Sequence, residues 1–208
     1  MTGIVAVLPM KPLALCKTRL SMILDDKERA TLSIEMFRRV TKSALLSNVD
    51  YVWVVGGDQR VRSETLALGA DWCHDMGHDF NESLSKAFSS AKRSKLVAMY
   101  IPADLPFLKS GDIDELIGLS NEGEILVLSP AQRDGGTNGM LVPICSEFQP
   151  ALGKNSFQRH REQIKALGAD FEICESDGFA LDLDTPEDFL ICEQIDPDFR
   201  TTYIGAVQ

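Results

Sequence analysis

The sequence predicts an α/β fold in which helices cover both faces of a mostly parallel sheet. Short apolar runs alternate along the chain with longer segments whose apolar residues recur at helical spacing. The runs 4–8 and 51–55 are apolar or aromatic without interruption, as is typical of strands buried on both faces. Such alternation indicates βαβ units. The 208 residues contain no repeat or low-complexity linker, so we expect one domain over residues 1–208, with a C-terminal tail from roughly residue 194.

The individual elements follow from local patterns. The first strand is expected to end at Pro9, which has no amide proton for the ladder. Apolar residues at fourfold spacing, Leu32 to Ala44, predict a helix over 26–46. A final helix should begin at Pro186, with Thr185 as its N-cap. The remaining expected elements are helices at 60–68, 81–93, 112–119 and 157–167, and strands at 71–73, 96–101, 125–128, 140–142 and 171–174.

Composition excludes several classes of protein. The chain has 21 Lys and Arg against 31 Asp and Glu, a net charge of −10, which disfavours binding to nucleic acid. The five cysteines are widely spaced without a Cys-x-x-Cys pair, so we expect free thiols in a reducing cytoplasm. The sequence contains no apolar stretch of membrane-spanning length, and its first apolar run is too short for a signal peptide, so we expect a cytoplasmic protein without membrane contact. The sequence leaves a homodimer open.

Ligands of such sheets bind beyond the carboxyl ends of the strands, and the loop after the first strand is basic. It carries Lys11, Lys17 and Arg19 in an otherwise acidic chain. Cations together with backbone amides can cradle a triphosphate. The spacing is not that of a Walker A loop, and a solvated basic loop is the alternative.

Carboxylates follow two other expected strands. Asp104 lies between Pro102 and Pro106, in a rigid loop that suits a metal ligand, although a turn-capping role is the alternative. Asp182 and Asp184 are two residues apart in a segment expected to be extended, so their side chains should share a face. Three such carboxylates predict a site for Mg²⁺ or Mn²⁺. The alternative for Asp184 is a favourable charge at a helix start.

A Gly-rich loop and a helix start carry further polar residues. The loop 133–139 contains Gly135 and Gly136, which permit close approach to a ligand but are equally consistent with a hairpin turn. The helix starting near residue 156 offers a site for an anion at its N-terminus. His160 either lines that site or lies on the helix face. His74 and His78 have the spacing of a helical zinc site, but Gly77 favours a loop and a structural role.

These segments together resemble the 2-phospholactate guanylyltransferase family, whose members include the phosphoenolpyruvate and 3-phosphoglycerate guanylyltransferases of coenzyme F-420 biosynthesis. The resemblance spans roughly residues 4–190. The segments that carry it are PMKPLALCKTRL, DFNESLSKA, PADLP, RDGGTNGMLV, GKNSFQRH and LDLDTPEDF. The chain departs from the family at Asp79–Phe80–Asn81, where Gly-Leu-Asn is more usual, and at Cys16 before Lys17.

The resemblance implies a Rossmann-like fold of the nucleotide-diphospho-sugar transferase type. It implies a metal-dependent transfer of GMP from GTP to 2-phospho-L-lactate, phosphoenolpyruvate or 3-phospho-D-glycerate, with release of pyrophosphate. Another small-molecule nucleotidyltransferase, such as a molybdopterin guanylyl- or cytidylyltransferase, is the alternative, and a non-catalytic binding protein on the same fold is a third. The implied residues are Lys17, Arg19 and Asp104 for catalysis; Lys11, Lys17, Arg19 and Asn81 for the nucleotide; Thr137, Gly153 and Ser156 for the acceptor; and Asp104, Asp182 and Asp184 for the metal.

Overall fold

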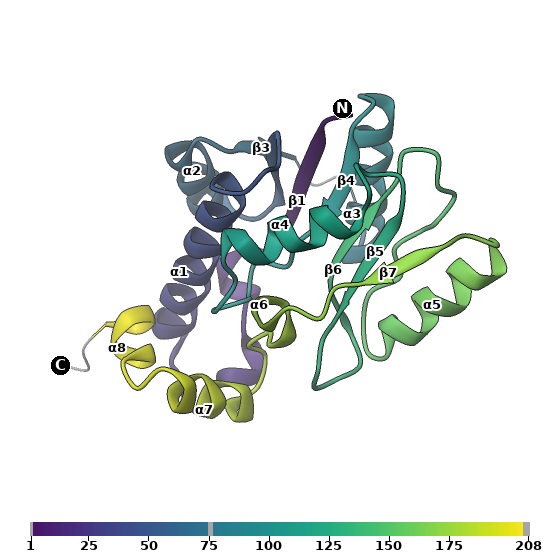
Figure 1. Ribbon diagram of the computed structural model, residues 1–208. Helices are drawn as coiled ribbons and strands as arrows, with labels where there is room; N and C mark the ends of the chain where they lie inside the picture. The colour runs from purple at the N-terminus through teal and green to yellow at the C-terminus, as the bar shows by residue number, and fades with distance from the viewer. Residues whose placement is uncertain (1, 75–76, 206–208) are drawn as a thin grey trace.

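One twisted sheet of seven strands runs through the molecule, which confirms the predicted α/β class (Figure 1). The computed structural model describes residues 2–74 and 77–205. The strand order is β3-β2-β1-β4-β6-β5-β7, with β6 antiparallel to both of its neighbours and the other pairs parallel. The strands are β1 (Ile4–Met10), β2 (Tyr51–Gly56), β3 (Asp71–Cys73), β4 (Val97–Tyr100), β5 (Leu126–Pro130), β6 (Thr137–Val142) and β7 (Phe171–Ile173).

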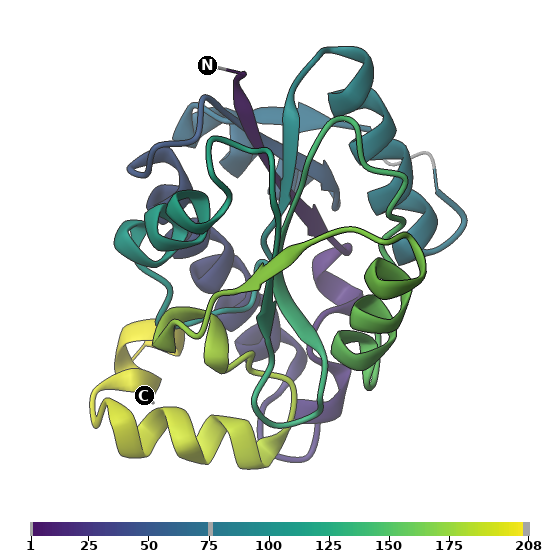
Figure 2. The same ribbon diagram turned by 45° about the vertical axis from the view of Figure 1, so that its right-hand side comes forward.

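Helices cover both faces of the sheet (Figures 1 and 2). Alternate residues of β1 point to opposite faces: Leu8 belongs to the core with Phe37, and Val7 to the core with Leu84. The first core is covered by α1 (Asp26–Leu45), α2 (Gln59–Leu68), α4 (Ser110–Leu119) and α6 (Asp177–Ala180), and the second by α3 (Phe80–Arg93) and α5 (Ser156–Ala166). No helix in the described ranges is long and apolar enough to span a membrane.

Strand β1 is longer than the sequence predicts, because it continues through Pro9 to Met10. Val7 accepts a hydrogen bond from the amide of Ile101 on the β4 side, so Pro9, two residues on, faces the same side. Strand β4 ends at Tyr100, and no strand ladder continues there. The missing amide proton of Pro9 therefore costs no sheet hydrogen bond, and the strand carries on against β2, where Pro9 pairs with Val55.

The C-terminal part contains one predicted helix and one helix that the sequence analysis did not resolve. Helix α7 (Pro186–Ile195) begins at the predicted N-cap Thr185, and α8 (Phe199–Ile204) lies within the expected tail. Phe199 and Tyr203 of α8 are buried in a third apolar cluster, here termed the C-terminal cluster. Its buried members are Leu20, Leu24, Leu32, Met36, Leu183, Phe189, Cys192, Phe199 and Tyr203.

The segment before α7 corrects one expectation. The sequence predicts an extended segment over 180–184, but α6 ends at Ala180 and residues 181–184 join no strand of the sheet. The amide of Leu183 donates instead to the carbonyl of Asp104, at 3.1 Å. Leu183 is fully buried between the more exposed Asp182 and Asp184, so the alternation of side chains survives without a strand.

Candidate active site

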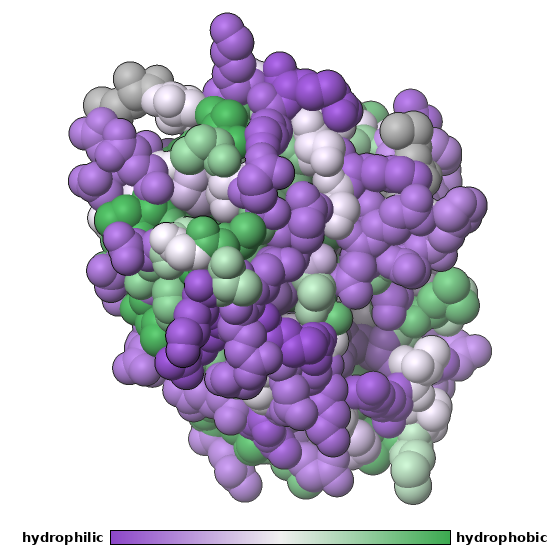
Figure 3. Space-filling view, turned by 90° about the vertical axis from the view of Figure 1, so that its right-hand side faces the viewer, coloured by the Kyte–Doolittle hydropathy of each residue, from purple (hydrophilic) through white to green (hydrophobic). Residues whose placement is uncertain are grey.

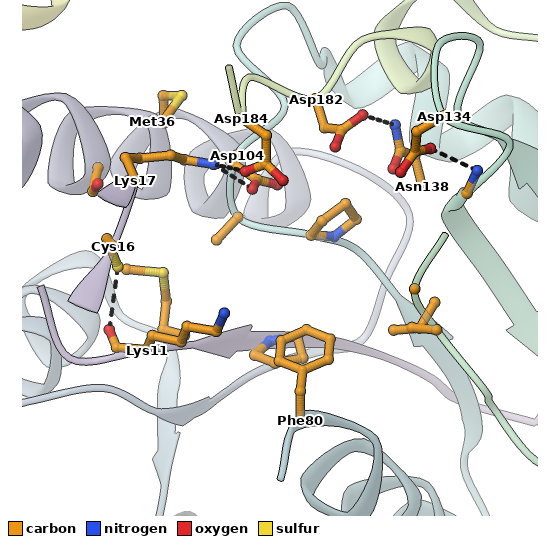
Figure 4. A pocket seen from close by; sticks show the side chains of 18 of the residues that line it. Lys11, Cys16, Lys17, Met36, Phe80, Asp104, Asp134, Asn138, Asp182 and Asp184 are labelled. Atoms are coloured by element: carbon orange, nitrogen blue, oxygen red, sulfur yellow. Dashed lines mark hydrogen bonds and ion pairs between the residues drawn. The ribbon is translucent and has the colours of Figure 1, made fainter. Parts of the chain in front are cut away.

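A cavity of about 510 Å³ opens where the chain order of the sheet reverses, at the carboxyl ends of β1 and β4. From β1, the sheet continues to β2 on one side and to β4 on the other, which is the usual ligand position in open α/β sheets. All the residues predicted for the site line this cavity: Lys11, Lys17, Arg19, Asn81, Asp104, Thr137, Gly153, Ser156, Asp182 and Asp184. Figure 4 shows several of them facing one another from separate loops.

Lys17 lies between two of the carboxylates (Figure 4). Its ammonium nitrogen is 2.5 Å from Oδ2 of Asp104 and 2.9 Å from Oδ1 of Asp184, and its side chain is 7% exposed. Burial disfavours the charged ammonium, but the two carboxylates more than reverse this and raise the pKa of Lys17. Lys17 has a left-handed backbone, φ 51°, between the short 3₁₀ turns η1 (Leu13–Leu15) and η2 (Thr18–Leu20). This conformation turns its side chain inward while the chain runs past the cavity.

The other cations of this loop are free to meet a ligand. Lys11 and Arg19 are both exposed, and Nη1 of Arg19 is 3.8 Å from Oδ2 of Asp184. Burial would raise the pKa of Asp184, but Lys17 first, and then Arg19 and Lys11, lower it. Asp184 is therefore ionised at neutral pH, and the loop presents positive charge beside it.

Among the residues that the structure describes, no Lys, Arg or His forms an ion pair with Asp182. Its Oδ1 accepts a hydrogen bond of 3.0 Å from the amide of Asn138, which also donates to the carbonyl of Phe179. Burial, followed by the charge of Asp104, raises the pKa of Asp182 to about 6. Asn138 was not among the predicted site residues, although it lies in the Gly-rich motif. An amide placed after two glycines and next to Thr137 is the signal that could have found it.

The side chains of the predicted metal ligands Asp104, Asp182 and Asp184 are not arranged to coordinate one common ion in this structure. Within residues 2–74 and 77–205, no group of three His, Cys, Asp or Glu side chains is placed to hold a metal ion. Lys17 takes one oxygen from each of Asp104 and Asp184, while Asp182 is held by Asn138. The three side chains nevertheless fit a hard divalent cation, because all of them are carboxylates. Their charges repel one another, as the effect of Asp104 on the pKa of Asp182 shows. The ammonium of Lys17 neutralises part of this charge.

Asp188 holds the acidic segment from the first turn of α7. Its Oδ2 accepts hydrogen bonds from the amides of Asp184 and Thr185, at 3.0 and 2.7 Å, and from the hydroxyl of Thr185 at 2.9 Å. Its Oδ1 lies 2.6 Å from a guanidinium nitrogen of Arg133, on the Gly-rich loop. The capping box of α7 therefore also fixes the backbone of Asp184 and ties two walls of the cavity together.

The predicted acceptor residues lie on β6 and at or just before the start of α5. Thr137 begins β6, and Ser156 begins α5; both are buried, with their hydroxyl oxygens 3.2 Å apart. The Gly-rich loop is the hairpin between β5 and β6, and it also contacts the α5 loop, since the amide of Phe157 donates to the carbonyl of Gly135. Gly135 and Gly153 have φ of 69° and 122°, which favour glycine.

The start of α5 differs from the expected anion site in one respect. The amide of Ser156 donates to the carbonyl of Gly153 and that of Phe157 to Gly135, so these two donors are not free for an anion. His160 does not line the cavity: it is 1% exposed and lies behind Thr137, with its Nδ1 2.9 Å from the threonine oxygen. The hydroxyls of Thr137 and Ser156 are therefore the side-chain donors that these two residues can offer to a ligand.

Asn81 has a structural partner. Its amide nitrogen donates to the carbonyl of Leu152, and its oxygen accepts from the amide of Leu152, at 3.3 and 2.7 Å. This pair clamps α3 to the loop before α5, while the side chain borders the cavity next to Phe80. The segment from His74 to His78, for which the sequence favours a loop and a structural role over a zinc site, includes residues 75–76, which lie outside the described residues.

The chain matches the family described as CofC-like guanylyl transferases over residues 4–193. The chain belongs to this family. It is 33% identical to the phosphoenolpyruvate guanylyltransferase of Rubrobacter xylanophilus over 89% of this chain and 91% of the relative. It is 34% identical to the 3-phospho-D-glycerate guanylyltransferase of Phenylobacterium zucineum, over 83% and 81% of the two chains. It is 30% identical to the 2-phospho-L-lactate guanylyltransferase of Methanocaldococcus infernus, over 88% and 81%.

A solved structure supports the fold assignment of this CofC-like chain. The crystal structure of a nucleotide-diphospho-sugar transferase from Desulfovibrio desulfuricans G20 superposes with a TM-score of 0.77, covering 98% of this chain and 93% of that one at 16% identity. This confirms the predicted nucleotide-diphospho-sugar transferase type of fold. The family match confirms the resemblance inferred from the motifs, and the chain is a guanylyltransferase by family.

Proposed function

We propose that this guanylyltransferase transfers GMP from GTP to a phosphorylated three-carbon acid, releasing pyrophosphate, as a step of coenzyme F-420 biosynthesis. The observation that carries the proposal is one cavity that is lined by all ten residues to which the family resemblance gives a role. The acceptor is 2-phospho-L-lactate, phosphoenolpyruvate or 3-phospho-D-glycerate, the three acids named for its relatives. The family match favours this reaction over the molybdopterin alternative.

The reaction joins two anions, and the cavity supplies charge against their repulsion. A phosphate oxygen of the acid forms a bond to the α-phosphorus of GTP, and the bond from that phosphorus to the bridging oxygen breaks, so its electron pair leaves with pyrophosphate. We assign Lys11, Lys17 and Arg19 to the triphosphate, where their charges stabilise the transition state. The acid phosphate is already ionised at neutral pH, so the chain needs no strong general base.

Asp104, Asp182 and Asp184 are the proposed ligands of Mg²⁺ or Mn²⁺. A bound divalent cation would neutralise phosphate charge and act as a Lewis acid. In this structure the Lys17 ammonium binds one oxygen of Asp104 and one of Asp184, so full use of these carboxylates as ligands would require Lys17 to move. The flexible four-carbon side chain of Lys17 allows its ammonium to turn toward the triphosphate. The positive charge of Lys17 would then pair with phosphate oxygens in place of the carboxylates.

The proposed acceptor residues line the same cavity as the carboxylates. We assign Thr137 and Ser156, with the backbone of Gly153, to the carboxylate end of the acid. Its phosphate end would then point toward Asp182 and Asp184. Asn81 completes the nucleotide side in this proposal, through its position next to Phe80, although its amide group is already paired with Leu152.

The test is a reaction with defined substrates. The purified chain is incubated with GTP, MgCl₂ and one of the three acids at a time, and products are identified by mass while pyrophosphate release is followed. We expect a guanylylated product with at least one acid, none with lactate in place of 2-phospholactate, and much less with CTP than with GTP. Asp104→Asn should reduce turnover by orders of magnitude, because it removes charge from the cation site.

Failure would be equally plain. Absence of product with all three acids would reject the proposed acceptors, and product formation with CTP as good as with GTP would reject the guanylyl assignment. Undiminished turnover after metal chelation would reject the divalent-cation site while leaving the transfer reaction in place.

A further inference from the structure

His160 is a buried histidine with both ring nitrogens engaged. Nε2 lies 2.9 Å from the backbone nitrogen of Ala151, and Nδ1 lies 2.9 Å from the hydroxyl oxygen of Thr137. The ring of Phe148 meets it edge-on, with centroids 5.2 Å apart, which fixes its plane. The proposed function uses Thr137 but assigns no role to His160.

The side of α5 that faces away from His160 is exposed and polar. Hydrophilic residues cover much of the face of the molecule that carries α5 (Figure 3).

The contacts determine which ring nitrogen carries the proton. A backbone amide can only donate, so Nε2 of His160 must accept from Ala151. In a neutral imidazole the proton is then on Nδ1, which donates to the hydroxyl oxygen of Thr137. Burial, with a smaller effect from the charge of Arg159, lowers the pKa of His160 to about 4, so the ring is neutral at physiological pH.

Counting protons shows what this donation does to the two hydroxyls. Thr137 and Ser156 have one hydroxyl proton each, and the single bond between their oxygens uses one of them. His160 accepts neither, because it donates to Thr137. One hydroxyl proton therefore remains, and among the described residues no acceptor takes it. Both residues border the cavity, so that proton is available to a ligand there.

We infer that His160 is a positioning residue that makes the Thr137–Ser156 pair a fixed hydrogen-bond donor to an anionic oxygen of the acceptor acid. The inference rests on the proposed function for the identity of the ligand. A carboxylate or phosphate oxygen only accepts hydrogen bonds, so a wall that always donates suits it. The chain is acidic, and the first two amides of α5 already donate to Gly153 and Gly135, so the hydroxyl pair would bind an anion without a charged side chain.

A purely structural role predicts something different. The bond to Ala151 attaches the loop before α5 to the helix, and any acceptor at the Nε2 position would serve that purpose. Only the bond to Thr137 affects the hydroxyl pair. Variants that keep the hydrogen bond to Ala151 and remove the one to Thr137, or the reverse, can therefore separate the two roles.

The first measurement needs no substrate. In the ¹⁵N-labelled wild-type chain, imidazole NMR signals should show His160 with its proton on Nδ1 and no protonation between pH 6 and 8. A proton on Nε2, or titration in that range, would overturn the inference whatever the catalytic activity. This test uses the wild-type chain alone, so it does not depend on whether any variant folds.

The second measurement uses two variants with acid and GTP kinetics. His160→Gln places an amide oxygen near the Nε2 position and leaves no donor near Thr137. We expect its Tm to stay close to that of the wild type, and its KM for the acid to rise roughly three- to tenfold, as for loss of one neutral hydrogen bond. KM for GTP should be unchanged. His160→Asn keeps an amide donor at the δ position, so it should lower Tm but restore KM for the acid to within about twofold.

The control is His74→Gln, since His74 is an exposed histidine next to Trp72 and away from the cavity. It should match the wild type in both KM values. An unchanged KM for the acid in His160→Gln, or an equal rise for acid and GTP, would overturn the positioning role. A wild-type chain that transfers GMP to none of the three acids would instead reject the proposed function, and the NMR result would still stand.

Discussion

Among the three predicted metal ligands, Asp182 is the one that no described cation neutralises. Lys17 balances Asp104 and Asp184, whereas the carboxylate of Asp182 accepts hydrogen bonds from the side chain of Asn138 and from its own backbone. Its pKa of about 6 lies above the ordinary 3.8, so its carboxyl form is stabilised in the folded chain. Such a group contributes stability below pH 4 that is lost as the pH rises through 6.

Asp182→Asn should therefore stabilise the metal-free protein at neutral pH while abolishing its activity. The substituted amide can still accept from Asn138 but has no charge to bury. The gain in free energy of unfolding over the wild type should grow from near zero at pH 4 to at most about 3 kcal/mol at pH 7.5, since each pKa unit corresponds to about 1.4 kcal/mol.

Denaturant unfolding in the presence of a chelator, at several pH values between 4 and 7.5, measures this difference. Asp170→Asn, at an exposed loop position, is the matched control and should show no such trend. A difference that is constant with pH would mean that Asp182 is not strained by burial and by its neighbours.

At the scale of elements, the first turn of α7 positions the acidic segment. Asp188 is 5% exposed and receives the amides of Asp184 and Thr185, so the capping box of a helix also orients a proposed metal ligand. Replacing it with alanine leaves these amides without an acceptor and Arg133 without its ion-pair partner.

Asp188→Ala should lower the free energy of unfolding by about 1–3 kcal/mol, the cost of leaving buried donors unpaired. Turnover should fall by at least roughly tenfold, because the backbone of Asp184 loses its support and small misplacements of reacting groups are costly. Glu187→Gln, on the exposed side of the same turn, is the control for a lost helix-start charge. Normal turnover in a destabilised Asp188→Ala variant would restrict Asp188 to helix capping.

The order of strands and helices was largely predictable from the sequence because it depends on local patterns, as does the Thr185 cap, whereas the end of β1 and the helix α8 were not. The left-handed turn at Lys17 and the role of Asp188 were not predictable either, because each depends on partners that only the folded chain brings close. Asp182 and Asp184 were expected to share a face in an extended segment. They line the same cavity, but a hydrogen bond from Leu183 to the loop of Asp104 holds the segment in place of strand pairing.

At the scale of the whole molecule, the C-terminal cluster joins two walls of the cavity. Leu20 directly follows Arg19, and Leu183 lies between Asp182 and Asp184; both are fully buried in this cluster. Phe199 packs at its centre, stacked on Tyr203 at 4.3 Å and edge-on to Phe189 at 5.6 Å. The hydroxyl of Tyr203 donates to the carbonyl of Pro106, at 2.5 Å, in the loop that carries Asp104.

Phe199→Ala should therefore impair both stability and catalysis, although Phe199 does not line the cavity. Removing a fully buried phenylalanine typically costs about 3–5 kcal/mol. In a chain of this size, that corresponds to a fall in Tm of roughly 6–20 °C. At a temperature where the variant is still folded, we expect a higher KM for GTP and a lower kcat, because the cationic loop and the acidic segment lose their common support.

Leu190→Ala is the matched control, since Leu190 lies on the same pair of C-terminal helices but is 56% exposed. It should change Tm by no more than about 2 °C and leave the kinetics unchanged, as surface substitutions usually do. Normal GTP kinetics in a destabilised Phe199→Ala variant would show that α8 stabilises the fold without holding the cavity walls. Impaired kinetics in both variants would point instead to a general effect of the C-terminal helices. We expect Phe199→Ala but not Leu190→Ala to impair GTP kinetics, because Phe199 belongs to the C-terminal cluster, which connects α8 to Leu20 in the loop after β1.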